Sequence, residues 1–164
     1  MQLILRDSSL DLEVIGEKSA SSFTIDMNKL FEDFVANLLI EKLGEGNIML
    51  QQTEYPEVKG NKLKIRLDIE IFRNGIPFII LDTKYKEYGN APDMGHITQL
   101  SLYSLSTGVK NCGLIYPGKF EPEFFLIKPD IRVHILPFNL AASSKLEFEE
   151  NCSEFEASLK SLPL

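Results

Sequence analysis

Two charged residues, Asp82 and Lys84, interrupt an otherwise apolar stretch, residues 76–85, which reads IPFIILDTKY. Because side chains alternate along a strand, Asp82 and Lys84 are expected on one face, about 7 Å apart. A carboxylate and an ammonium at that spacing can hold a divalent cation beside the oxygen that it activates, which suits phosphodiester cleavage. Two such charges alone more often form a surface salt bridge, so this chemistry depends on ligands from elsewhere in the chain.

The preceding stretch, residues 63–72, alternates between apolar and charged side chains, which predicts a half-buried strand. Its charged side consists of Lys64, Arg66, Asp68 and Glu70. Glu70 is interpreted as a solvent-facing partner of Lys64 or Arg66. Asn74-Gly75 then separates the two apolar stretches and predicts a hairpin between them.

The length of the hairpin connection decides which residues face each other. A strict two-residue loop places Asp82 opposite Leu67 and sends Asp68 to the other face, whereas one extra residue places Asp68 opposite Asp82. The longer connection also matches apolar to apolar, with Ile69 opposite Leu81 and Ile71 opposite Ile79. We therefore predict a bulge or a three-residue loop. Two opposing carboxylates repel each other unless a cation lies between them, so the register itself indicates a metal site.

A helix is predicted over residues 25–43, where apolar residues recur at helical spacing between a Thr24/Asp26 cap and Gly44. At about 100° per residue, Glu32 falls at the edge of the buried face and Asp33 on the opposite side. Glu32 is therefore a candidate ligand, although it could equally accept a hydrogen bond from a neighbouring backbone amide.

A second helix is predicted over residues 97–106, ended by Gly108, with Gln99 and Tyr103 one turn apart on one face. These two residues suit packing and hydrogen bonding as well as a site. Further strands are predicted at residues 112–116, 124–127 and 131–136, and a helical tail from residue 142. The element order implies an α/β fold, a mixed central sheet flanked by helices. Residues 1–16 fit either a short helix or a pair of strands.

Composition fits one globular domain over residues 1–164, with 44% hydrophobic and 25% charged residues. No apolar run reaches the roughly 18 residues of a membrane span, and a cytoplasmic location is expected. The net charge of −7 disfavours unaided binding to nucleic acid. Residues 59–86, however, hold seven Lys and Arg against three acids, so the cations gather near the candidate site. Among them, Lys62, Lys64 and Lys86 are expected to face phosphates if the chain is a nuclease.

Four short sequence motifs carry a family resemblance: IDMNKLFEDFV (residues 25–35), RLDIEI (66–71), IILDTKYK (79–86) and QLSLY (99–103). In order and spacing they resemble the PD-(D/E)XK nuclease superfamily. Within it, the chain looks most like the McrC nuclease-subunit family of the McrBC 5-methylcytosine restriction system, over roughly residues 1–116. Leu67 stands where the superfamily's name has a proline, a position at which many members vary.

The resemblance implies a restriction-endonuclease-like core and a DNA endonuclease that depends on Mg²⁺, for which Mn²⁺ may substitute. It implies that Asp68 and Asp82 ligate the metal, with the Thr83 carbonyl as a further ligand and Glu32 bound directly or through water. Lys84 then orients the attacking water or helps to deprotonate it. Gln99 and Tyr103 position the DNA backbone or the metal shell.

The resemblance also implies a partner, a McrB-like AAA+ subunit that hydrolyses GTP, reads methylated DNA and translocates. Residues 1–22 are a possible remnant of an N-terminal region that contacts this partner, and residues 142–164 form the helical tail. An alternative is a non-catalytic assembly or DNA-docking subunit that keeps the nuclease fold. A hydrolase acting on another phosphate ester or on RNA also stays open.

Overall fold

The computed structural model describes residues 25–58, 60–62, 64–89 and 91–162. Its helices are α1 (Met27–Leu43), α2 (Met94–Thr107) and α3 (Lys145–Lys160), with a short 3-10 helix at Glu45–Asn47. Its strands are β1 (Ile48–Glu54), β2 (Glu57–Val58), β3 (Asn61–Lys62), β4 (Ile65–Arg73), β5 (Ile76–Thr83), β6 (Asn111–Pro117), β7 (Glu123–Ile127) and β8 (Ile131–Phe138). The predictions for residues 1–16 and 1–22 lie outside the described residues.

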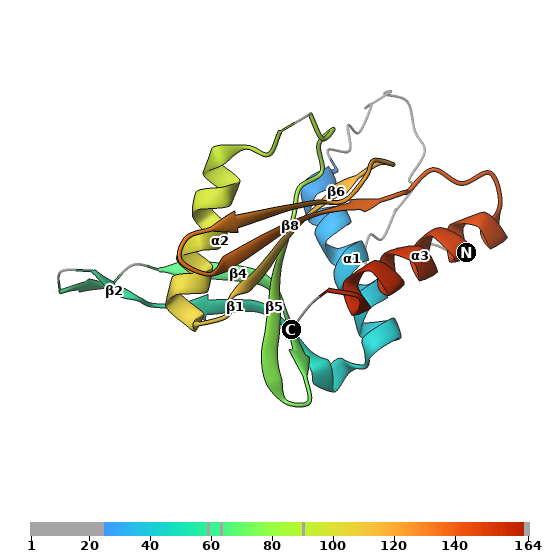
Figure 1. Cartoon of the computed structure of the whole chain (residues 1–164). Coiled ribbons are helices and arrows are strands. Elements are labelled where there is room, and N and C mark those ends of the chain that lie inside the picture. Colours follow the sequence, from blue (N-terminus) through green and yellow to red (C-terminus); the bar gives the residue numbers. More distant parts are fainter. Residues whose placement is uncertain (1–24, 59, 63, 90, 163–164) are drawn as a thin grey trace, which may run out of the picture.

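A six-stranded mixed sheet in the order β1-β4-β5-β6-β8-β7 forms the centre of the molecule (Figure 1). Helices α1 and α3 pack on one face of the sheet, and α2 packs on the other. The predicted α/β fold with a mixed sheet flanked by helices is confirmed. Strands β4 and β5, which carry the predicted acids, lie inside the sheet and are covered on both faces.

Helix α1 begins and ends where its capping residues predict. The side chain of Asp26 accepts hydrogen bonds from the backbone amides of Asn28 and Lys29, which satisfies donors that lack helical partners. Gly44 ends the helix with φ of 88°, a conformation that glycine adopts without strain. Phe31, Val35 and other apolar residues of α1 are buried against the sheet. The helix therefore fixes the direction of the Glu32 side chain.

The β4–β5 hairpin has the predicted irregularity. Asn74 and Gly75 both have positive φ, 55° and 75°, as a two-residue turn of the hairpin type requires. The register shifts between Ile71 and Phe72, and beyond this bulge the predicted pairs Ile69–Leu81 and Ile71–Ile79 are confirmed. Pairing stops at Ile69–Leu81, so the next two facing residues, Asp68 and Asp82, lie where the strands separate.

The prediction that β4 has one apolar and one charged face is wrong, because its apolar residues pack on both faces of the sheet. Ile65 and Leu67 pack with α2, whereas Ile69 and Ile71 pack with α1 and α3. The change of face occurs at Asp68, where pairing with β1 skips a residue and pairing with β5 ends. The solvent-facing interpretation of Glu70 is wrong, since only 8% of this residue is exposed, and burial, with Glu54 nearby, raises its pKa.

The remaining predicted elements are present with shifted ends. Helix α2 starts three residues earlier than predicted because Asp93 caps it, and it ends at Gly108 as predicted. The three later strands and helix α3 of the tail are confirmed. Strand β1 and the small β2–β3 hairpin, which projects from the sheet in Figure 1, have no counterpart in the predictions. No helix within the described ranges is long and apolar enough to cross a membrane.

Candidate functional site

Asp82 is a buried carboxylate that lacks the partners such a group normally has. It lies near the end of β5 with 1% of its surface exposed. Neither carboxylate oxygen has a hydrogen-bond partner among the described residues. The Lys84 ammonium lies 2.7 Å from Asp82 Oδ2, as an ion pair rather than a well-directed hydrogen bond. A buried charge with so little compensation is costly, and such groups gather at functional sites.

Asp68 approaches Asp82 from the neighbouring strand. Burial, followed by the contact with Asp82, raises the pKa of the Asp68 carboxyl from 3.8 to about 7. Two carboxylates repel each other, so Asp68 can hydrogen-bond to Asp82 only when it carries a proton. Lys84 and Arg66 oppose the effect through their positive charges. Asp68 therefore keeps a proton to higher pH than an ordinary aspartate, at the position where the sequence predicts a shared cation.

Lys84 and Thr83 are held in place by the parallel neighbour β6. The Lys84 backbone amide donates to the Ile115 carbonyl at 2.9 Å, and Thr83 pairs with Ile115 in the register. The Lys84 side chain keeps 21% of its surface exposed, so its ammonium reaches both Asp82 and solvent. In this structure Lys84 is the ion-pair partner of Asp82, the salt bridge that these two charges alone would predict.

Helix α2 places Tyr103 on the same cleft as Asp68. Tyr103 is buried, and the Gln99 side-chain amide donates a hydrogen bond to its phenol oxygen. Burial raises the pKa of Tyr103, and the charges of Asp82 and Asp68 act in the same direction. Because Gln99 occupies the phenol oxygen as a donor, the phenol hydrogen is available to an acceptor elsewhere.

Glu32 lies on the wall of the site rather than beside the two acids. Its side chain keeps 18% of its surface exposed. Glu32 Oε1 accepts a hydrogen bond of 3.1 Å from Gln51 Nε2 and lies 3.9 Å from the cations of both Lys29 and Arg66. Within the described part of the chain, no three His, Cys, Asp or Glu side chains converge closely enough to hold a metal ion. The structure thus joins Asp68 to Asp82 and leaves Glu32 apart.

An open cleft of about 730 Å³ connects these residues. Its lining residues come from α1, β4, α2 and the chain just outside them: Asp26, Asn28, Lys29, Glu32, Lys64, Ile65, Arg66, Asp68, Gly95, Thr98, Gln99, Leu102 and Tyr103. Acids and cations therefore share one surface, with Asp68 directly accessible and Asp82 buried behind it. Gln51, which contacts Glu32 from β1, is a residue of this region that the sequence analysis missed.

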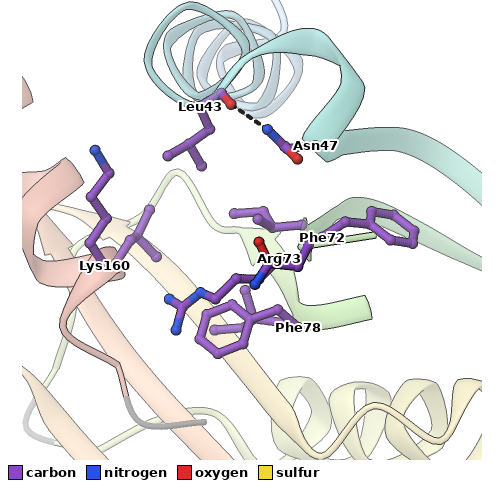
Figure 2. A pocket seen from close by; sticks show the side chains of 10 residues that line it. Leu43, Asn47, Phe72, Arg73, Phe78 and Lys160 are labelled. Carbon is purple, nitrogen blue, oxygen red and sulfur yellow. Dashed lines mark hydrogen bonds between the residues drawn. The ribbon is translucent and has the colours of Figure 1, made fainter. Parts of the chain in front are cut away.

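A second hollow, of about 230 Å³, is a poor candidate for this chemistry. It is lined by residues of α1, the β4–β5 hairpin and α3 (Figure 2). The Arg73 guanidinium lies over the Phe78 ring, 3.6 Å from its centroid, and Lys160 flanks the opening. Among the described residues no acidic side chain lines this hollow, so they supply no carboxylate ligand for a cation there.

The donor set around Asp82 fits a hard divalent cation. Mg²⁺ prefers carboxylate, carbonyl and water oxygens, and it usually keeps several waters. The two Asp82 oxygens without hydrogen-bond partners and the Asp68 carboxyl supply oxygens of this kind, and the open cleft leaves room for water. Two protein carboxylates suffice for such a site when water and a phosphate complete it.

The fold and the paired acids at the separating strands define an α/β protein with a restriction-endonuclease-like core. Over residues 1–117 the sequence matches the family described as "McrBC 5-methylcytosine restriction system component". The chain belongs to this family, and the predicted resemblance to the McrBC system is confirmed. No curated protein matches the sequence.

A solved structure shares the fold. A chain from a half-complex of the tetradecameric assembly of Thermococcus gammatolerans McrB AAA+ hexamers with bound McrC superposes with a TM-score of 0.67 and 22% sequence identity. The match covers 84% of this chain and 34% of that chain, so the present chain spans about a third of that one's length. A protein of unknown function, AF1548, matches with a TM-score of 0.45 and 14% identity, over 77% of this chain and 65% of that one.

Proposed function

We propose that the chain is a Mg²⁺-dependent DNA endonuclease that serves a 5-methylcytosine-dependent restriction system and cuts foreign DNA. One observation carries the proposal: a second carboxyl, Asp68, lies against the buried Asp82 carboxylate, whose ion-pair partner among the described residues is the Lys84 ammonium. A bound cation would compensate both charges. Membership of the McrBC family supports the same activity.

The site residues take the following proposed roles. Asp68 and Asp82 hold the cation, with the Thr83 carbonyl as a further ligand and Glu32 acting through water, because Glu32 lies apart from the pair. A bound Mg²⁺, or Mn²⁺ in its place, supplies Lewis-acid activation of water and of the phosphate. Lys84 orients that water and stabilises negative charge on the phosphate. Gln99 and Tyr103 hold the DNA backbone or the water shell.

A partner subunit is part of the proposal. The chain has a net charge of −7, so unaided DNA binding is expected to be weak. The related structure contains McrB AAA+ hexamers with bound McrC. We infer that a similar GTP-hydrolysing AAA+ subunit brings methylated DNA to this chain, in the cytoplasm, where foreign DNA is met.

The test is cleavage of supercoiled, 5-methylcytosine-containing plasmid by the purified chain, with Mg²⁺ or Mn²⁺, with and without the AAA+ partner. Asp82→Asn and Lys84→Ala are each expected to lower the rate at least about 100-fold, since removal of one transition-state contact costs about 2.7–4 kcal/mol. Glu121→Gln, at an exposed acid that does not line this cleft, serves as the control and should retain full activity.

Two results would separate the proposal from its alternative. If wild type and both site variants are equally inactive with the partner present, yet all assemble with it, the chain is a non-catalytic docking subunit. Cleavage of RNA in preference to DNA would instead assign the same site to another phosphodiester.

A further inference from the structure

Gln51 has a backbone conformation that strand residues rarely adopt. Its φ is 52°, although it lies in the middle of β1. Positive φ is uncommon for residues other than glycine and marks strain or a specific role. Pairing of β1 with β4 passes from Leu50–Ile69 directly to Gln52–Leu67, so Gln51 faces Asp68 without pairing with it. The irregularity therefore lies beside the acid at which the β4–β5 ladder ends.

The side chain of Gln51 provides a second, independent observation. Gln51 Nε2 donates to Glu32 Oε1 at 3.1 Å, across 19 residues of sequence. The cations of Lys29 and Arg66 each lie 3.9 Å from the same oxygen, and their side chains are 47% and 52% exposed. The Gln51 amide thus donates to an oxygen that two exposed cations also attract.

We infer that Gln51 is a positioning residue of the proposed metal site: its amide fixes the Glu32 carboxylate on the cleft wall, facing the cleft that Asp68 lines. The left-handed backbone directs the amide to Glu32 and interrupts the ladder beside Asp68. Outer hydrogen bonds of this kind orient the groups that serve a metal, and their loss commonly costs 10- to 100-fold in metal affinity or activity. This inference rests on the proposed function, because it assigns Glu32 a role toward the cation.

A matched pair of variants tests the role of the amide. Gln51→Glu keeps the size of the side chain but replaces the donor with a carboxylate that repels Glu32. Gln52→Glu adds the same charge one residue away, where the exposed Gln52 side chain donates to the Leu50 carbonyl. We expect the Mg²⁺ concentration for half-maximal plasmid cleavage to rise about 10- to 100-fold in Gln51→Glu and to stay unchanged in Gln52→Glu. The rise in Tm with added Mg²⁺, a readout independent of activity, should shift to the same higher concentrations.

A double variant tests whether Gln51 acts through Glu32. In a Glu32→Ala background, Gln51→Glu should have no further effect on the Mg²⁺ response, because the residue it acts through is gone. Gln51→Gly serves as the fallback if Gln51→Glu folds poorly, because glycine accepts φ of 52° without strain. It removes the amide, so the same rise in the required Mg²⁺ concentration is expected.

The possible failures are distinguishable. A normal Mg²⁺ response in wild type together with equal responses of Gln51→Glu and Gln52→Glu overturns this inference alone. If wild type neither cleaves with its partner nor gains Tm with Mg²⁺, and Asp82→Asn behaves identically, the proposed function fails and this inference fails with it.

Discussion

At the scale of single residues, the Asp68 carboxyl makes the stability of the protein depend on pH. The pKa of Asp68 is about 7 in the folded protein and has its ordinary value of 3.8 in the unfolded chain. Between these values the folded state keeps a proton that the unfolded state has lost, so the free energy of unfolding falls as pH rises from about 4 to about 7. Above that window Asp68 is charged beside Asp82, and the cation-free site carries its full electrostatic cost.

Asp68→Asn is therefore expected to stabilise the cation-free protein at pH 8, by between about 1 and about 4 kcal/mol. The amide keeps the size of the side chain and removes the second charge beside Asp82. Urea unfolding at pH 5 and pH 8 in EDTA measures the effect, which should be far smaller at pH 5. Glu121→Gln, at an exposed acid, is the control. An equal gain at both pH values would contradict the raised pKa of Asp68.

At the scale of elements, the hairpin turn determines the register that brings the two acids together. Gly75 has φ of 75°, and a Cβ added there meets no atom within 4 Å, so alanine would be opposed by the backbone alone. Gly75→Ala is expected to cost about 1–2 kcal/mol. Gly46→Ala, where a Cβ also meets nothing and φ is not positive, should cost less than about 0.5 kcal/mol. Urea midpoints of the two variants test this difference, and equal midpoints would mean that the turn conformation adds no strain.

The sequence predicts those elements whose signals lie within a few residues, and it misses features that depend on contacts between distant segments. Asn74-Gly75 and the caps of α1 act within a few residues, and matching apolar residues across the hairpin was enough to place Asp68 opposite Asp82. Strand β1 reads IMLQQTE without clean alternation, so periodicity missed it. The conformation of Gln51 and its bond to Glu32 depend on contacts between distant segments. Burial of Glu70 likewise depends on the neighbouring strands, which a pattern within one strand does not include.

At the scale of the whole molecule, an acidic chain presents cations along one cleft. Lys29, Lys64 and Arg66 line the same cleft as Asp68, although the net charge is −7. Under the proposed function these cations contact DNA phosphates without reading bases. The chain alone is then expected to bind DNA weakly and with strong dependence on salt.

Lys64→Gln should lower the slope of log affinity against log salt concentration by about one, because one phosphate contact is lost. Binding of a short duplex in Ca²⁺, measured by fluorescence anisotropy over a series of salt concentrations, gives this slope. Lys119→Gln removes an exposed cation that lines a different hollow, and its slope should match wild type. Equal slopes for both variants would place the DNA away from this cleft.

The close approach of the Lys84 ammonium to Asp82 has a consequence for how a cation would enter. Below about pH 7 two positive charges lie at the strand ends, the Lys84 ammonium and the proton on Asp68. A divalent ion that displaced both would bring in as much charge as it removed. Binding of the divalent ion would then be an exchange of cations that leaves the net charge of the site nearly unchanged. The released ammonium would be free to meet the phosphate that arrives with the metal.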